Sequence, residues 1–303
     1  MNKLTAQNIL VVGSSNTDMV IKIDRLPRPG ETVTGGTFFM NPGGKGANQA
    51  VSAARLGGNV TFICKTGNDI FGSQAKQLFE KEGIDTSRMF SDSDHPSGVA
   101  LITVDSEAEN CIAVASGSNA NLLPEDISTV REAVEKADII LMQLEIPVET
   151  IKYVTEIARK HGKKVILNPA PAQPLDHELL QSLYLITPNE TEAEMISGIK
   201  ITDDDSLKAC ARAIYDMGVQ SVIITLGSKG AFLYTGDSGE RIPGNEVKAV
   251  DTTAAGDVFN GALAVAVSEG YDLTGAIRFA NKAAAISVTR VGAQASAPYR
   301  NEV

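Results

Sequence analysis

A run of small residues that ends in an acid, residues 251–257, is the first part of the sequence that could do chemistry. Ala255 and Gly256 stand directly before Asp257, and an apolar segment of helical character follows. Small side chains at the start of a helix leave its free N–H groups uncovered, and the helix dipole adds positive potential there. The run therefore predicts a site for developing negative charge on a phosphate. Asp257 as a plain helix cap is the simpler alternative, but a cap does not require small residues before it.

A glycine-rich run at residues 42–50, Pro-Gly-Gly-Lys-Gly-Ala-Asn-Gln-Ala, is the second chemical signal. Its missing side chains would let a ligand reach backbone N–H groups just before a helix. The spacing fits neither a phosphate loop nor a dinucleotide fingerprint, since Gly46 and not Ser or Thr follows Lys45. A tight strand-to-helix turn would need only the glycines, whereas Lys45 and Asn48 add the donors that a polyol requires. The run therefore indicates a site for a polyhydroxylated ligand.

Both runs need a scaffold, and the rest of the chain predicts a parallel sheet covered by helices on both faces. Strands are expected at 9–12, 60–64, 139–144, 165–168, 183–187, 222–226 and 231–234, and helices at 47–56, 72–82, 124–136, 148–161, 206–217, 255–269 and 273–288. Pro124 and Pro147 are each expected at a first helical position. Ligands of such sheets collect at the carboxyl ends of the strands. The loops there carry polar sets at 16–18, 143–145, 187–192 and 225–230, which are candidate site segments.

Four more segments, 19–23, 31–40, 98–104 and 110–115, are rich in Thr, aromatic and branched residues. They predict a small antiparallel sheet built from two insertions, at about 18–41 and 98–115. We expect this sheet to be a lid on one α/β domain that spans residues 1–303. An isolated small sheet is marginal in water and exposes apolar surface, so two lids are expected to pair in a homodimer.

Composition narrows the class of protein. The chain has 303 residues, 43% hydrophobic and 21% charged, with a net charge of -10. The negative charge disfavours nucleic acid and anionic lipid as partners, and no apolar run is long enough to span a membrane. The first residues show no secretory signal, so a cytoplasmic location is expected. Cys64, Cys111 and Cys210 are expected as buried free thiols, and His95, His161 and His177 on the surface.

Together these segments resemble the ribokinase, or phosphofructokinase B type (PfkB), family of carbohydrate kinases. The resemblance covers nearly the whole chain and rests on the runs at 42–50, 189–192 and 250–263, supported by 16–18, 29–33 and 167–172. It implies a ribokinase-like three-layer α/β/α sandwich with a mostly parallel central sheet and a small antiparallel β lid. Two positions depart from the family pattern: Val258, where Thr is common, and Pro42, where an aromatic or small residue is usual.

The resemblance also implies roles for individual residues. Ala255 and Gly256 would form the anion hole with Asp257, which would also be the general base. The pentose would be bound by Asn16, Asp18, Gly44, Lys45, Asn48 and Glu145, with Ala100, Ile102 and Ile112 of the lid over its apolar face. ATP would be bound by Asn189, Thr225, Gly227, Ser228, Lys229, Gly230 and Asn281. Glu192 would act on Mg²⁺ through water, and an activating K⁺ would be bound by Asp251, Thr253, Ser287, Arg290, Gly292 and Ser296.

The implied function is ATP-dependent phosphorylation of D-ribose at O5, which gives D-ribose 5-phosphate and ADP. Fructose, deoxyribose and adenosine remain open as alternative substrates, because hydroxyl recognition depends on the shape of the lid. A sugar-binding sensor without catalysis would predict a broken anion hole, yet residues 255–257 are intact. A dinucleotide-dependent oxidoreductase is disfavoured because no glycine fingerprint follows the first strand.

Overall fold

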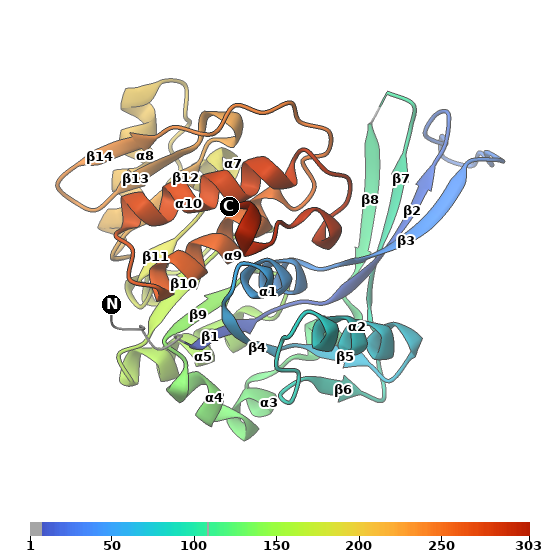
Figure 1. Cartoon of the computed structure of the whole chain (residues 1–303), viewed down its shortest axis with the longest axis horizontal. Coiled ribbons are helices and arrows are strands. Elements are labelled where there is room, and N and C mark those ends of the chain that lie inside the picture. The colour runs from blue at the N-terminus through green and yellow to red at the C-terminus, as the bar shows by residue number, and fades with distance from the viewer. Residues whose placement is uncertain (1–7, 108) are drawn as a thin grey trace.

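The computed structural model describes residues 8–107 and 109–303, and its centre is an eight-stranded sheet (Figure 1). In spatial order its strands are β14 (Gly239–Ile242), β13 (Ala231–Tyr234), β12 (Val222–Thr225), β11 (Leu185–Ile186), β10 (Lys164–Leu167), β9 (Ile139–Met142), β1 (Asn8–Val12) and β4 (Asn59–Ile63). The pairs from β12 through β4 are parallel, whereas β13 pairs antiparallel with both of its neighbours. The mostly parallel sheet is therefore confirmed.

Helices cover both faces of this sheet because each central strand is apolar on both sides. In β1, Ile9 and Val11 pack into one buried cluster, and Leu10 and Val12 pack into the other. One face carries α1 (Lys45–Arg55), α9 (Ala255–Ser268) and α10 (Leu273–Ser287), which lie in front of the sheet in Figure 1. The opposite face carries α3 (Pro124–Thr129), α4 (Arg131–Lys136), α5 (Val148–Lys160), α6 (His177–Gln181), α7 (Glu190–Ser197) and α8 (Asp204–Asp216). These three layers are the expected sandwich.

The lid is a separate four-stranded sheet that projects from one side of the body (Figure 1). Its order is β3 (Thr37–Gly43), β2 (Asn16–Lys22), β7 (Gly98–Val104) and β8 (Asn110–Ala115). The pairs β2/β3 and β7/β8 are antiparallel, and β2 joins the two halves by pairing parallel with β7. At the foot of the lid lie α2 (Ile70–Lys81) and a small sheet of β5 (Lys65–Gly67) and β6 (Phe90–Asp92).

Several expected boundaries move for local reasons. The expected strand 31–40 begins only at Thr37, because Glu31 is held in a turn by its hydrogen bonds with Arg28. The expected helix 124–136 is divided at Val130 into α3 and α4. Pro124 is the first residue of α3 as expected, but Pro147 precedes α5 as its N-cap.

The cysteine expectation is wrong for one thiol. Cys64 and Cys210 are buried, but Cys111 is exposed, because all of β8 is an exposed edge strand of the lid. The surface positions of His95, His161 and His177 are confirmed. Within the described residues, no helix has the length and apolar character that a membrane span requires.

Short 3-10 helices complete the fold. They lie at η1 (Gly117–Asn121), η2 (Gly227–Lys229), η3 (Gln294–Ser296) and η4 (Arg300–Glu302).

Candidate active site

The predicted site residues come together because β1, β9, β10, β11 and β12 run parallel and end at the same edge of the sheet. Just beyond that edge lie Asn16 after β1, Glu145 after β9, Asn168 after β10 and Asn189 after β11. The first turn of α9 reaches the same place, since Asp257 contacts the side chains of Asn48 and Gln49 on α1. Topology therefore brings together residues as distant in sequence as Asn16 and Asp257.

Asp257 is the third residue of α9, but its carboxylate does not cap the helix. It is buried, and it accepts hydrogen bonds from Asn48 Nδ2 at 2.9 Å and from Gln49 Nε2 at 3.0 Å. Burial raises the pKa of Asp257, and the nearby Lys45 ammonium and the two amide donors oppose that rise. A buried, oriented carboxylate whose pKa is raised is suited to accept a proton.

The first turn of α9 is open to an anion. Ala254, the N-cap, has a positive φ of 58°, which costs a residue with a Cβ some strain. Gly256 is exposed, and, its chain neighbours and the adjoining backbone of its own helix aside, no atom of the described residues lies within 4 Å of the place where a Cβ would stand. The N–H groups of Gly256 and Asp257 lie in the turn that has no intrahelical acceptors. Ala255 N–H instead donates to Thr252 O at 3.2 Å, so one of the three expected donors is already engaged.

The glycine-rich run crosses the β1–β2 connection at very close range. A Cβ on Gly44, whose φ is 90°, would stand 2.7 Å from Asn16 N, and a Cβ on Gly46 would stand 2.5 Å from Ser14 N. A Cβ on Gly43 would lie 2.3 Å from the Asp18 carboxylate. The glycines therefore serve backbone packing first, and this packing brings Asp18 next to the start of α1.

Polar groups on both sides of this crossing point to a ligand. The Oδ1 atom of Asn48 is buried without a hydrogen-bond partner among the described residues, although Asn48 is only 8% exposed. Glu145 Oε2 accepts from Lys45 N at 2.9 Å and from Ser14 Oγ at 2.5 Å. Burial, followed by the charges of Glu145 and Asp257, raises the pKa of Asp18 to about 6.

Lys45 balances these acids. Burial alone would lower the pKa of Lys45, but the carboxylates of Asp257, Glu145 and Glu192 outweigh it and raise that pKa. Lys45 therefore stays protonated among three acids, and the site can accept an anionic phosphate only with further positive charge.

The lid presents the expected apolar residues on the face that bears Asp18. Asp18 is paired with Ala100, and Ile102 is paired with Ile112. Paired residues point to the same side of a sheet, and positions 100 and 102 alternate onto one face. Ala100, Ile102 and Ile112 thus share the Asp18 face.

Where nucleotide is expected to bind, Asn189 and Glu192 form a reciprocal cap on α7. Asn189 Oδ1 accepts from Glu192 N at 2.8 Å, and Glu192 Oε2 accepts from Asn189 N at 2.9 Å. Asn189 also forms a β-bridge with Thr225 at the end of β12. Burial raises the pKa of Glu192, against the opposing hydrogen bonds from Asn189 and the charge of Lys45.

The other residues expected to bind nucleotide surround the end of β12. Gly227, Ser228 and Lys229 form the exposed turn η2, and Gly230 closes it through a hydrogen bond from its N–H to Gly227 O at 3.0 Å. Asn281 lies on α10, where its Nδ2 donates to Pro243 O at 3.1 Å.

The segments expected to bind K⁺ are joined by Asp251. Its Oδ2 accepts from Gly292 N at 2.8 Å and its Oδ1 accepts from Thr253 N at 2.9 Å. The backbone adds a hydrogen bond from Val250 N to Val288 O at 2.7 Å. The loop before α9 is thus tied to the 287–296 segment. Within the part of the chain that the structure describes, no three His, Cys, Asp or Glu side chains are arranged to hold a metal ion directly.

Three further site residues, Gln49, Gln143 and Asn168, lie in the segments 42–50, 143–145 and 167–172 that the sequence marks, but the sequence assigns none of them an individual role. Their side chains are buried and hydrogen-bonded to one another beside Asp257. Nothing in the sequence shows that these amides meet, because the three segments come together only in the folded chain.

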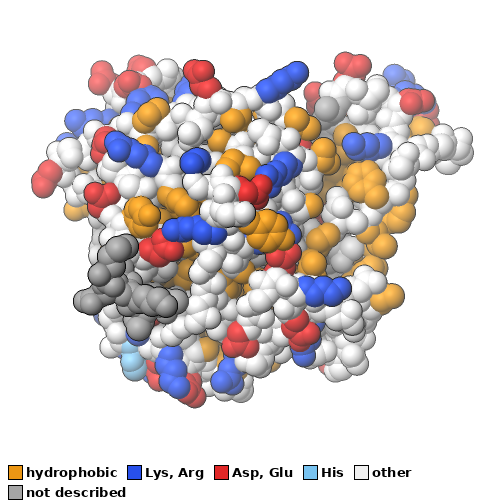
Figure 2. Space-filling model, viewed as in Figure 1, with side chains coloured by type: hydrophobic (Ala, Val, Ile, Leu, Met, Phe, Trp, Pro, Cys, Tyr) orange, Lys and Arg blue, Asp and Glu red, His pale blue; other side chains and the backbone are white. Residues whose placement is uncertain are grey.

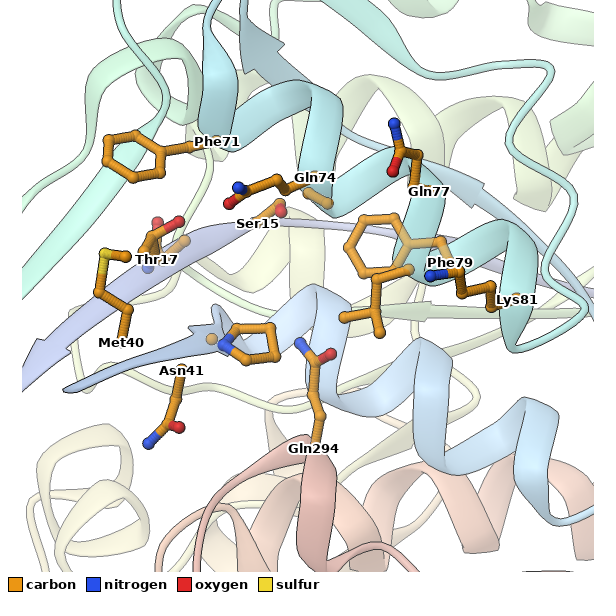
Figure 3. A pocket seen from close by; sticks show the side chains of 15 residues that line it. Ser15, Thr17, Met40, Asn41, Phe71, Gln74, Gln77, Phe79, Lys81 and Gln294 are labelled. Atoms are coloured by element: carbon orange, nitrogen blue, oxygen red, sulfur yellow. The ribbon is translucent and has the colours of Figure 1, made fainter.

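A cavity of about 370 Å³ lies elsewhere, between α2 and the root of the lid (Figure 3). Thr17 and Met40 line it from the lid, Phe71 and Gln74 from α2, and Gln294 from η3. Thr17 alternates with Asp18 along β2, so this cavity is on the opposite face of the lid sheet from the Asp18 carboxylate.

Comparison with known proteins agrees with this geometry. The model of the pfkB family carbohydrate kinases matches residues 6–300. A ribokinase of Haemophilus influenzae is 45% identical over 296 residues, which cover 98% of this chain and 97% of that protein. A deoxyribokinase of Salmonella typhimurium is 39% identical over 292 residues, covering 96% of this chain and 95% of that one.

Solved structures agree as well. The structure of Arabidopsis thaliana ribokinase complexed with ribose and ATP superposes with a TM-score of 0.93 at 34% identity and covers 98% of this chain and 97% of that one. Ribokinase from Thermotoga maritima gives a TM-score of 0.88 at 43% identity, with the same coverage. This chain therefore belongs to the pfkB family of carbohydrate kinases.

Proposed function

We propose that this protein transfers the γ-phosphoryl group of ATP to O5 of D-ribose and releases D-ribose 5-phosphate and ADP. The observation that carries the proposal is the buried Asp257 carboxylate at the open first turn of α9, held by Asn48 and Gln49. Phosphoryl transfer needs alignment, charge neutralisation and removal of one hydroxyl proton, and little else from the protein. The ribokinase relatives support ribose as the substrate.

In this mechanism Asp257 receives the O5 proton as the new bond to phosphorus forms. The proton leaves late, when the alcohol has become acidic, so a carboxylate is a strong enough base. The negative charge that develops on the transferred group faces the uncovered N–H groups of Gly256 and Asp257. Lys45 stays protonated and offsets part of the charge of the surrounding acids.

The sugar would lie between the start of α1 and the lid. Asn48 Oδ1 gives a buried acceptor for a hydroxyl, and Asn16, Asp18, Gly44, Lys45 and Glu145 surround the same space. Ala100, Ile102 and Ile112 would cover the apolar side of the ring. A polar floor under an apolar cover suits a pentose, whose hydroxyls lie on its edges.

ATP would bind over the carboxyl ends of β11 and β12. Asn189 and Thr225 would face its phosphates. The exposed turn of Gly227, Ser228 and Lys229, closed by Gly230, would lie beside the nucleotide, with Asn281 near the base. Mg²⁺ fits this site as a partner of the phosphates, because one Glu192 oxygen is committed to Asn189 N–H and no direct three-ligand cluster exists in the described residues. Such an ion would neutralise phosphate charge.

A monovalent cation fits beside Asp251, in the loop tied to Thr253 and to the 287–296 segment. Carbonyls near Ser287, Arg290, Gly292 and Ser296 would complete its oxygen shell. The ion would order the loop that leads into α9 without entering the chemistry. Potassium chloride should therefore raise turnover relative to choline chloride at equal ionic strength, and equal rates would exclude this role.

Two lids would pair through the face opposite Asp18. Ile21, Phe38, Met40 and Leu101 are all between 42% and 56% exposed and alternate onto that face. Figure 2 shows hydrophobic side chains gathered over the lid side of the molecule. Burial of this surface in a homodimer is favourable. Sedimentation at micromolar concentration should give twice the chain mass, and a monomer would rule out the pairing.

The three free cysteines suit a reducing compartment such as the cytoplasm.

A second substrate, 2-deoxyribose, is favoured by the deoxyribokinase relatives at 39% identity. A coupled ADP-release assay with ribose, deoxyribose, fructose and adenosine would rank the candidates, and phosphorus NMR of the product would locate the new ester. Ribose should give the highest kcat/KM and a 5-phosphate. A higher value with another acceptor would replace ribose as the substrate.

A further inference from the structure

A chain of buried amides extends from Asp257 into the protein interior. Gln49 Nε2 donates to Asp257 Oδ1 at 3.0 Å and to Asn168 Oδ1 at 3.1 Å, and Gln49 Oε1 accepts from Gln143 Nε2 at 2.6 Å. Gln49 and Gln143 have no exposed surface. Burying such amides is costly unless they form hydrogen bonds, so this arrangement calls for an explanation beyond packing.

This series of hydrogen bonds leads back to the first turn of α9. Asn168 Nδ2 donates to Thr187 O at 3.2 Å, and Thr187 Oγ1 donates to Asn260 Oδ1 at 2.6 Å. Asn260 Nδ2 donates to Gly256 O at 2.8 Å. These bonds form a closed ring that links α1, β10, the end of β11 and α9. The ring fixes both the carboxylate of Asp257 and the backbone of the turn around it.

Asn168 determines which end of the Gln49 amide faces Asp257. A glutamine amide could present either its oxygen or its NH₂ group. Because Asn168 Nδ2 donates to the carbonyl oxygen of Thr187, Asn168 Oδ1 is left to accept from Gln49, and the NH₂ group of Gln49 must point toward Asn168 and Asp257. Gln143 Nε2 then donates to the Gln49 oxygen. Asp257 thus meets a donor, which favours its ionised form.

We propose that Gln49 is a positioning residue that holds Asp257 Oδ1, so that Oδ2, beside Asn48, is the oxygen that takes the proton. The inference rests on the proposed role of Asp257 as the base. Asn48 is the residue whose free Oδ1 marks the sugar side, and its Nδ2 donates to Oδ2 at 2.9 Å. The carboxylate therefore has one oxygen committed to the protein interior and one directed at the substrate.

The charges around Asp257 make its protonation state depend on the Gln49 donor. From α1, Lys45 favours the ionised carboxylate. Glu145 after β9, Glu192 on α7 and Asp18 on β2 carry like charges that interact unfavourably with it. Without the Gln49 donor, the balance moves toward the protonated form, which cannot act as a base.

The test is the pH dependence of the single-turnover rate in a Gln49→Met variant, which keeps the length of the side chain and removes its hydrogen bonds. One hydrogen bond to a charged group corresponds to about one to two pH units. The acid limb, meaning the part of the pH profile in which the rate rises as the base loses its proton, should therefore move to higher pH by that amount. Misorientation should also lower the plateau rate by about tenfold to a hundredfold, with little change in the dissociation constant for D-ribose. A Gln49→Glu variant, which can still accept from Gln143, should shift the limb in the same direction and covers the case in which Gln49→Met does not fold.

Ser52→Ala is the matched control. Ser52 is also buried on α1, and its Oγ donates to Val258 O on α9 at 3.2 Å without contacting Asp257. Its acid limb should coincide with that of the parent. If the limbs of both Gln49 variants also coincide with the parent, the positioning role is overturned.

An Asp257→Asn variant tests the role of Asp257 as the base separately from the role of Gln49. If it is inactive while the Gln49 variants keep the parental limb, Gln49 is not a positioning residue but Asp257 can still be the base. If it turns over within a few-fold of the parent, the base is misassigned, and the inference about Gln49 is overturned with it.

Discussion

Replacing Asp257 by Asn should separate catalysis from stability. The substitution keeps the size of the side chain but removes the only carboxylate in the first turn of α9. Loss of a general base lowers turnover by about 10² to 10⁴, which corresponds to roughly 3 to 5 kcal/mol of activation free energy. Binding of ribose and ATP should change far less, because their other proposed contacts come from Asp18, Asn48 and Thr225.

The same substitution should not destabilise the fold. Burial raises the pKa of Asp257 above its ordinary value, so the folded protein holds the proton more tightly than the unfolded chain. Stability that depends on this group therefore falls as pH rises from the unfolded pKa through the folded one, so at pH 7, above the unfolded pKa, this group contributes less stability than it does in acid. Asn removes that loss, although one of the two amide donors must reorient. The variant should melt at a temperature equal to or above that of the parent.

The assay combines turnover by ADP release, calorimetric binding of ribose and a thermal melt at pH 7. A variant that turns over within a few-fold of the parent would refute the base assignment. A large drop in melting temperature would instead refute the inference that ionisation of Asp257 lowers stability.

Three other predictions concern the surroundings of the base. Ribose should bind more weakly as pH falls through about 6, where Asp18 becomes protonated and loses an acceptor; calorimetry should show this dependence in the parent and none in Asp18→Asn, and a flat parental profile would contradict it. Gly44→Ala should lower the melting temperature well beyond Gly57→Ala, because both glycines have positive φ but only the former would place a Cβ 2.7 Å from Asn16 N. The backbone strain shared by both variants is roughly 1–3 kcal/mol. Equal melting temperatures would show that the approach of the new Cβ to Asn16 N adds no cost. Asp251→Asn should abolish the response of turnover to potassium, and an unchanged response in that variant would exclude Asp251 from the cation site.

Much of the fold could be predicted because apolar runs and helix periodicity are local signals. The strands at 98–104, 110–115 and 231–234 lie where the sequence places them. The strand expected at 31–40 was misplaced because its composition suits a strand, whereas the hydrogen bonds of Glu31 form a turn. Such competition between propensity and side-chain contacts is not visible in composition.

The candidate site, like the fold, could be predicted only where the signal is local in the sequence. The sequence indicated the helix start at 255–257 and the glycine-rich run, because small residues stand out. Nothing local marked Gln49 as a partner of Asp257, since their 208-residue separation is closed only by the packing of α1 on α9. The packing role of the glycines is also not visible in the sequence: Gly44 and Gly46 allow two backbones to cross.

The lid has an evolutionary consequence. Its strands leave the body after β1 and return at α1, then leave again before β7 and return at η1, while Asp257, the proposed base, belongs to α9. Residues proposed to cover the sugar and residues proposed for the subunit contact therefore occupy opposite faces of one inserted module. Substitutions confined to this module can alter the proposed sugar cover and subunit contact without changing any residue of α9.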